Sequence, residues 1–214
     1  GLIRTQCTVA TRDAETAVAR YDVRTLVPDD VSTVAGIYEA LVSQRTGSAV
    51  RMPGAWPGFR FGSRWTEETC AFVVLNRDTG KVIGYVSYDS APRRCTVTEV
   101  GYVDESVFGT LLAGMARVAI ERRMENIVFH APPDDPFIQY CHRYGCEVKL
   151  VYPRNGNGMA RIIDQTALLR LVHPLFVRRL QEAGHADWSG VVEFRTDLGT
   201  DRLHFGKGGR EMHV

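Results

Sequence analysis

The sequence predicts an α/β domain with a mixed sheet, followed by a second and smaller unit. Over residues 21–153, apolar runs of strand length alternate with amphipathic helical segments. Two of these runs, 71–75 and 82–86, flank a turn with Asp and Gly that is typical of an antiparallel hairpin. The stretch 157–164 then precedes a new amphipathic helix and a hairpin-like run, which indicates a boundary between two units.

The chain divides into three predicted segments. Residues 1–20 are a strand and a linker: apolar and Thr residues mix over 2–11, and 12–20 is polar with alanines, as in a linker or short helix. No partner strand for this segment is evident, and it is consistent with the tail of a preceding domain. The α/β module covers 21–157, and the second unit covers 158–214.

The α/β module opens with a strand at 22–26 and a helix. Pro28, Asp29 and Asp30 supply an N-terminal helix signal, and the helix is expected to run to about Gln44. Its apolar residues recur on one face: Val31, Val34, Ile37, Tyr38 and Leu41. The Gly- and Pro-rich stretch 47–62 is predicted to be a loop anchored by the rings of Trp56, Phe59 and Phe61.

The rest of the module alternates strands and helices. Its predicted elements are three antiparallel strands at 71–75, 82–86 and 96–103, a helix at 108–123, a strand at 126–130, a short helix at 136–144 that Gly145 ends, and a strand at 147–152. Without further information, these elements predict an α/β domain with a mixed sheet.

The second unit begins with an apolar helix at 166–180, in which Pro174 must produce a kink or a restart. A strand is expected at 191–194. The glycines at 206–209 are better explained by a hairpin turn between strands at 202–205 and 211–214 than by a phosphate-binding loop.

The composition argues against several classes of partner. The net charge is +1 and the charges are interleaved, so we expect no nucleic acid and no membrane surface as partner. No apolar run is long enough to cross a bilayer, and the five cysteines show no disulfide-framework spacing. We therefore expect a cytoplasmic protein.

The order of these elements resembles the GCN5-related N-acetyltransferase (GNAT) superfamily. That fold is a mixed, mostly antiparallel sheet with helices on both faces. A closer resemblance, to the tandem acetyltransferases of the enhanced-intracellular-survival (Eis) type, rests on four runs: Pro132–Pro136, Tyr144–Cys146, Gly158–Asp164 and Trp188–Gly190. In that family, two acetyltransferase modules precede a sterol-carrier-like α+β domain. The resemblance implies that residues 21–153 are the second module and that the chain from about Asp164 opens the sterol-carrier-like domain.

The resemblance implies part of an acetyl-CoA-dependent enzyme that acetylates an amine of a small molecule or peptide. Two alternatives stay open: a non-catalytic GNAT-fold module for binding or assembly, and a self-contained GNAT with an atypical coenzyme site. As partners we expect a second copy of the chain, or contact with a preceding acetyltransferase module.

The expected coenzyme turn lacks the glycines of the superfamily. These enzymes bind the coenzyme A pyrophosphate through the amides of a glycine-rich turn between a strand and a helix. The matching residues here are 102–107, where Asp104 and Glu105 would each repel a phosphate at roughly 6 Å by about 0.7–3 kcal/mol. The helix dipole offers only about 0.3–1 kcal/mol in return. We expect weak or no binding, and ordinary charge placement in a first helical turn explains both acids.

The resemblance also suggests candidate site residues. Val100, Tyr102 and Val103 are the candidates for coenzyme contact. Active members carry a Tyr four residues before the Gly that ends the short helix, and it protonates the departing thiolate; Cys141 stands there, with Tyr140 beside it. These two are the catalytic candidates, although Tyr140 fits a packing aromatic better. Cys141, His142 and Cys146 do not match a zinc site, so no metal is expected.

Overall fold

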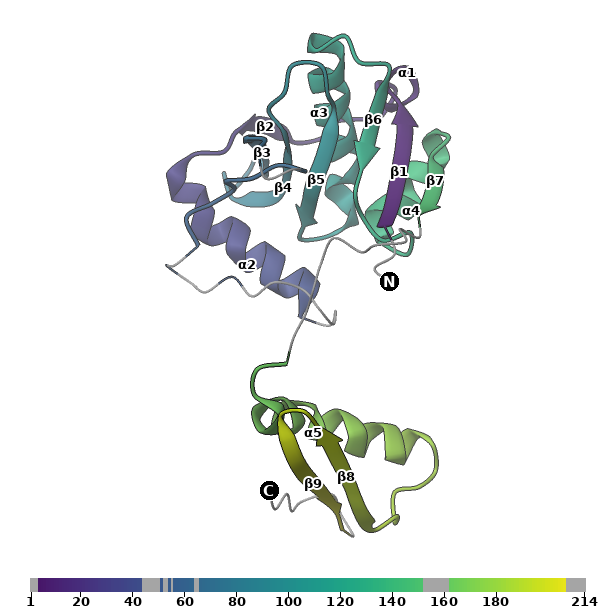
Figure 1. The fold of residues 1–214 in the computed structure, drawn as a ribbon. Coiled ribbons are helices and arrows are strands. Elements are labelled where there is room, and N and C mark those ends of the chain that lie inside the picture. Colours follow the sequence, from purple (N-terminus) through teal and green to yellow (C-terminus); the bar gives the residue numbers. More distant parts are fainter. Residues whose placement is uncertain are drawn as a thin grey trace. The chain divides into compact units, whose positions relative to one another are not determined.

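The structure is a computed structural model of the chain, which falls into two compact units, Gly1–Asn155 (unit 1) and Gly156–Val214 (unit 2). The residues that it describes are 4–43, 51, 54, 56–63, 66–151 and 162–206. Figure 1 labels the elements along the chain. In the described part, no helix is long and apolar enough to cross a membrane.

Unit 1 is built on one seven-stranded sheet in the order β2-β3-β4-β5-β6-β1-β7. All its pairings are antiparallel except the parallel pair β5 and β6. This confirms the mixed, mostly antiparallel sheet. The strands are β1 (Arg4–Ala10), β2 (Asp22–Thr25), β3 (Thr69–Leu75), β4 (Val82–Asp89), β5 (Thr96–Tyr102), β6 (Asn126–Phe129) and β7 (Glu147–Val151).

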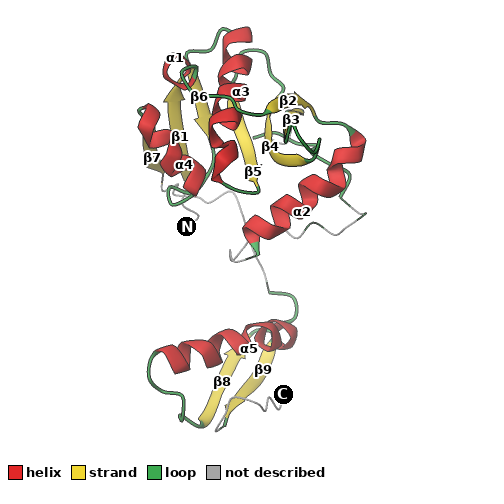
Figure 2. Cartoon of the chain, turned by 180° about the vertical axis from the view of Figure 1, so that it is seen from behind, coloured by secondary structure: helices red, strands yellow, loops and turns green. Residues whose placement is uncertain are grey.

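Helices cover both faces of this sheet. Phe72 and Val74 of β3 pack into the core with α3 (Phe108–Glu121) and α4 (Pro136–Cys141). Val73, which lies between them, packs on the opposite face with α2 (Val31–Val42), because side chains alternate along a strand. Figure 2, seen from behind, shows α3 and α4 in front of the strands.

Strand β1 lies between β6 and β7, a position that local sequence patterns do not indicate. Cys7 is opposite Phe129 of β6 on one side and opposite Val148 of β7 on the other. The short helix α1 (Thr11–Ala14) follows, and the chain then crosses to β2 at the far edge of the sheet (Figure 1). The N-terminal segment is therefore an inner strand of this sheet. Its origin as the tail of a preceding domain stays a prediction.

Local signals set the helix boundaries. A 3-10 turn, Pro28–Asp30, leads into α2. Asp135 caps α4 by accepting a hydrogen bond from the Phe137 amide (3.0 Å). Gly145 ends the short helical segment in the left-handed conformation with φ of 73°, as its position in the sequence predicts.

Two of the three predicted aromatic anchors of the 47–62 loop pack into a core cluster of unit 1. Trp56 and Phe59 pack against the cluster around Val34 and Tyr85. Phe61 is more exposed than these two rings, with 58% of its surface accessible. The part of this loop at 47–50, and three further positions in it, lie outside the described residues.

Unit 2 packs one helix on a two-stranded hairpin. The helix α5 (Gln165–Glu182) continues through Pro174, and β8 (Gly190–Thr196) pairs with β9 (Gly199–Phe205). Residues 202–205 pair with β8, and the predicted pairing with a strand at 211–214 lies outside the described residues and stays a prediction. The tight turn at 197–198 was missed because Asp197 and Leu198 lack the usual two-residue turn signature; Gly199 with φ of 133° follows it.

Candidate functional site

Strand β5 separates from its parallel neighbour β6 halfway along its length. The two strands pair only at Thr96 and Val97, whereas β5 continues to Tyr102 beside β4. The register against β4 shifts at this point, so that Thr98 is an extra residue, a β-bulge. Since a bulge increases local twist, β5 turns away from β6 where the parallel pairing stops.

Aromatic side chains bridge the two diverging strands on the α3 face. The Tyr102 hydroxyl donates to Asp135 Oδ1 (3.3 Å), just after β6 in the chain. The Tyr102 ring meets Phe108 edge-on at 4.7 Å between centroids, and Phe108 meets Phe137 at 5.5 Å. The space beside β5 on this face is thus filled by the chain itself.

The predicted coenzyme turn begins with a capping carboxylate. Asp104 Oδ1 accepts a hydrogen bond from the Ser106 amide (2.8 Å), at the start of the 3-10 turn Glu105–Val107 that leads into α3. The bonds from Ser106 lower the pKa of Asp104, so its negative charge is stabilised there. An amide that could bind a phosphate is therefore already used by a carboxylate of the chain, as the charge-placement interpretation expects.

The segment before β2 packs directly on the start of α3. A Cβ at Gly109 would come within 2.4 Å of the Val18 carbonyl oxygen, so glycine is required for this contact. The amides of Arg20 and Tyr21 donate to Thr110 Oγ1 at 3.0 and 3.3 Å. Gly109 thus serves helix-to-segment packing rather than phosphate binding. Sequence reasoning missed this contact, because it joins residues 89 or more positions apart.

The three candidates for coenzyme contact lie at the end of β5. The Val103 amide donates to the Ile83 carbonyl of β4 (3.0 Å), although 61% of the Val103 surface is exposed. Amides alternate in direction along a strand, so those of Val100 and Tyr102 point away from β4. A role of these residues in coenzyme binding stays a prediction.

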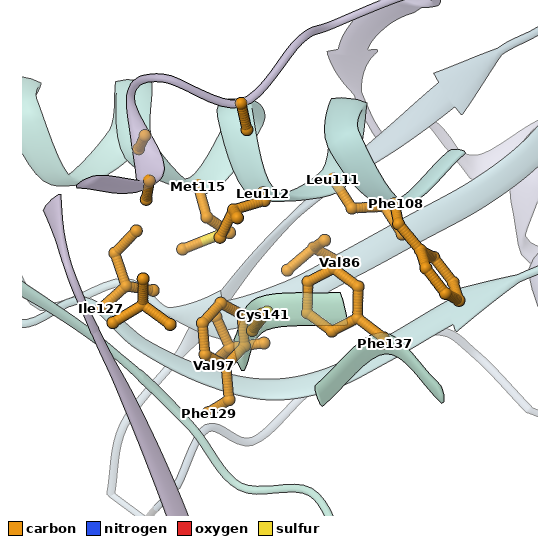
Figure 3. Close-up of a cluster of buried hydrophobic side chains, with 14 of the residues drawn as sticks. Val86, Val97, Phe108, Leu111, Leu112, Met115, Ile127, Phe129, Phe137 and Cys141 are labelled. Carbon is orange, nitrogen blue, oxygen red and sulfur yellow. The ribbon is translucent and has the colours of Figure 1, made fainter. Parts of the chain in front are cut away.

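The two catalytic candidates differ in their surroundings. Cys141 is fully buried, and burial raises the pKa of its thiol; Figure 3 shows it beside Val97 and Phe129 in the core. The Tyr140 hydroxyl shares a 2.9 Å hydrogen bond with that of Tyr144. Burial, and then this bond, raise the pKa of Tyr140 to about 12. Both are packing side chains here, and a catalytic role of either stays a prediction.

On the opposite face of the sheet lies a polar cluster that sequence reasoning missed. The Arg51 guanidinium binds both carboxylate oxygens of Glu99, with 2.7 Å from Nη1 to Oε1, and the Tyr85 hydroxyl donates to Oε1 (2.6 Å). Arg51 and Glu99 line a cavity of about 480 Å³, together with Trp56, Thr98 and others. Glu99 is the single charged residue of β5, and this is the sequence signal that points to the cluster.

Unit 2 has an apolar groove between α5 and its hairpin. Its volume is about 560 Å³, and it is lined by Phe176, Arg179, Leu180, His185, Trp188, Val192, Phe194 and Phe205. The rings of Trp188 and Phe205 lie 5.4 Å apart at its wall.

No protein-family model matches the chain, and no curated protein matches it in sequence. Solved structures do match in fold. A GCN5-related N-acetyltransferase from Anabaena variabilis superposes with a TM-score of 0.55 at 12% identity, over 96% of this chain and 51% of that one. Unit 1 has the GNAT fold.

Two further solved structures agree with this fold. A GCN5-related N-acetyltransferase from Kribbella flavida has a TM-score of 0.53 at 15% identity, covering 97% of this chain and 49% of its own. A protein from Enterococcus faecalis described as a probable N-acyltransferase has a TM-score of 0.51 at 14% identity, covering 70% and 38%. The chain thus spans about half the length of the two GNAT structures. It spans less than half of the third structure. A coenzyme-binding role of the β5–α3 turn stays a prediction of the sequence.

Proposed function

We propose that this chain is part of a longer, acetyl-CoA-dependent N-acetyltransferase of the Eis type, and that unit 1 is a GNAT-fold module without its own coenzyme site. The acetyl acceptor would be an amine of a small molecule or peptide. The observation that carries this proposal is the start of α3, where Asp104 uses an amide and the Val18 carbonyl lies against Gly109. These residues do not fit a pyrophosphate. Acetyl transfer would then occur in another module.

Unit 2 fits the opening of a sterol-carrier-like domain in this proposal. Its helix α5 packs on a hairpin beside an apolar groove, an arrangement that suits the first elements of an α+β domain. The matches to the two GNAT structures also extend into this unit, because they cover 96% and 97% of the chain.

Calorimetric titration of acetyl-CoA into the 214-residue chain tests the missing coenzyme site. No detectable heat at two temperatures, with unchanged thermal stability at millimolar acetyl-CoA, is the expected result. Micromolar binding would contradict the proposal and favour the self-contained acetyltransferase. A folded GNAT with an intact glycine-rich turn serves as the positive control.

A charge variant separates electrostatic from steric exclusion at this turn. Replacing Asp104 and Glu105 by Gly removes both charges, and electrostatics alone predicts stronger coenzyme binding. The carbonyl of Val18 stays against Gly109 in this variant, so we expect no measurable gain. A gain to micromolar affinity would show that charge, and not the covering segment, excludes the coenzyme.

An assembly role is the second candidate, supported by an edge strand of the sheet. Among the described residues, strand β7 pairs with β1 on one side only, and Val148 and Leu150 expose 38% and 48% of their surfaces. We propose that this edge contacts a second copy or another acetyltransferase module. Sedimentation at increasing concentration tests the first case: self-association that Val148→Lys weakens is expected, and a monomer at all concentrations would leave the neighbouring module as the remaining partner.

A further inference from the structure

The guanidinium of Arg51 is enclosed by aromatic rings. Its central carbon lies 3.6 Å from the centroid of the Tyr38 ring, 4.2 Å from that of Trp56 and 5.4 Å from that of Phe59. Each distance is within the range of a cation–π interaction. We call Tyr38, Trp56, Phe59 and Glu99 the Arg51 cage.

The carboxylate of Glu99 completes this cage with a negative charge. Both terminal nitrogens of Arg51 bind it, a geometry that suits a planar guanidinium better than an ammonium group. The Tyr85 hydroxyl holds one oxygen of the carboxylate in place, and Gly101 leaves room for the Tyr85 ring beside β5. The acceptor geometry is therefore set by the sheet and not by Arg51.

The Arg51 cage is open to solvent. The side chain of Glu99 is 24% exposed, and the cavity beside it holds about 480 Å³, enough for a small ligand. Arg60 and Phe61 stand at its rim, and both are exposed. A buried structural ion pair needs no such opening, whereas a binding site does.

Exchange of Arg51 for another guanidinium would be nearly balanced in energy. The entering guanidinium would make the same ring and carboxylate contacts that Arg51 gives up. The desolvation cost and the pairing energy of the ligand therefore largely cancel those of Arg51. Arg51 keeps one advantage, because its attachment to the chain acts as an effective concentration, and its amide also donates to Glu39 Oε1 (2.9 Å). A ligand of the natural chain must therefore compete with Arg51. Its apparent affinity is the intrinsic affinity multiplied by the fraction of molecules in which Arg51 has left the cage.

We propose that the Arg51 cage is a recognition site for a guanidinium-bearing ligand, and that Arg51 is its resident competitor. This goes beyond the proposed function, because the site lies on the α2 face of the sheet and needs no coenzyme. Arg51 reaches the cage from the segment after α2, while three of its four members come from β5 and from the Trp56–Phe59 stretch.

Butylguanidine is the test ligand, titrated by calorimetry into the full 214-residue chain without acetyl-CoA. Arg51→Met keeps most of the side-chain volume and removes the competing charge, so we expect at least tenfold tighter binding than in the natural chain. Arg60→Met is the matched control, since Arg60 lies at the rim, and should bind as the natural chain does. Butylurea, a neutral ligand of the same shape, should not bind to any of them.

Two further measurements make the proposal falsifiable. Adding Glu99→Gln to Arg51→Met should weaken butylguanidine binding at least tenfold. Butylguanidine binding to Arg51→Met that is no tighter than to the natural chain, or equal binding of butylurea, would overturn the proposal. The proposal would also be overturned if the natural chain bound no butylguanidine at a concentration one hundred times the Kd of the Arg51→Met variant. Arg51 would then be a structural residue that no ligand displaces.

If Arg51→Met fails to fold by circular dichroism, Arg51→Lys replaces it. Lysine keeps the charge and the stem but lacks the planar fork, so it competes less well for Glu99. Binding of butylguanidine to Arg51→Lys should then be tighter than to the natural chain, and unchanged binding would overturn the proposal. Because acetyl-CoA is absent throughout, these outcomes are independent of the coenzyme titration.

Discussion

Gly101 of β5 lies under the ring of Tyr85, its neighbour on β4. A Cβ at Gly101 would come within 2.0 Å of the Tyr85 Cε1 atom. Tyr85 is fully buried, and burial followed by the Glu99 charge raises the pKa of its hydroxyl, which therefore stays protonated as a donor to Glu99. Because Gly101 has no side chain, the Tyr85 ring can lie where its hydroxyl holds the Glu99 carboxylate of the Arg51 cage.

Replacing Gly101 by Ala should displace the Tyr85 ring and break its hydrogen bond to Glu99. Overpacking of this kind costs about 1–3 kcal/mol, measured as a lower free energy of unfolding in urea. Gly36→Ala in α2 is the matched control: nothing lies within 4 Å of its added Cβ, so it should stabilise by about 0.5–1 kcal/mol. A Gly101→Ala variant as stable as the natural chain would contradict this account.

At the scale of elements, two helix starts depend on carboxylates with different partners. At the start of α2, Asp30 accepts hydrogen bonds from both terminal nitrogens of Arg24 (2.6 and 2.8 Å) and from the Val27 amide (2.9 Å). At the start of α3, Asp104 accepts one from the Ser106 amide. The first ties a helix to β2, while the second shapes the turn itself.

Asp30→Asn should destabilise unit 1 by about 1–3 kcal/mol near neutral pH, because charged hydrogen bonds are lost. The hydrogen bonds from Arg24 are the largest cause that lowers the pKa of Asp30, and the bond from Val27 adds to it. Desolvation acts in the opposite direction but is smaller. The stabilisation is therefore complete above the unfolded carboxyl pKa of about 3.9 and is lost as pH falls through the lower folded value. Urea unfolding from pH 7 to pH 2 measures this.

Exposed Asp29 provides the control for Asp30. Asp29→Asn should leave stability near neutral pH within about 0.5 kcal/mol of the natural chain. If Asp30→Asn retained the full acid dependence of the natural chain, other carboxylates would be responsible for it.

Gly109→Ala should separate the Val18–Tyr21 segment from α3, because the new Cβ would overlap the Val18 carbonyl. The expected cost is about 1–3 kcal/mol. Hydrogen exchange gives a local measurement. The amides of Arg20 and Tyr21, which donate to Thr110, should exchange faster in the variant. The amides of β4 should lose only the protection that the lower global stability accounts for. Unchanged exchange at these two amides would show that the contact is not required.

At the scale of the whole molecule, each unit has its own core. In unit 1, one cluster joins α3, α4 and the sheet, and Leu111 is fully buried within it. In unit 2, Leu203 is fully buried between β9 and α5. Separate cores of this kind can unfold separately.

Leu203→Ala should destabilise unit 2 alone by about 2–5 kcal/mol, since it leaves a cavity in a small core. Leu111→Ala should do the same to unit 1. Hydrogen exchange read by mass spectrometry, unit by unit, distinguishes the two. Loss of protection in both units from either single variant would show that they fold as one.

Much of unit 1 could be predicted from the sequence because its signals are local. Hydrophobic periodicity located the strands and helices, and Pro28, Gly145 and the 76–81 turn marked their boundaries. The predicted weakness of the coenzyme turn also rests on neighbouring residues, Asp104 and Glu105, and Asp104 proved to cap that turn. The β8–β9 turn was missed because its residues carry no strong signature.

What the sequence by itself determined is the order of the elements, the mixed sheet and the charges at the expected coenzyme turn, all of which depend on residues within a few positions of each other. Only the tertiary structure decided that β1 lies between β6 and β7, that Val18 covers Gly109, and that Arg51 meets Glu99. These contacts join residues far apart in the chain. Their formation depends on strand pairing and packing of the whole unit, which no local pattern encodes.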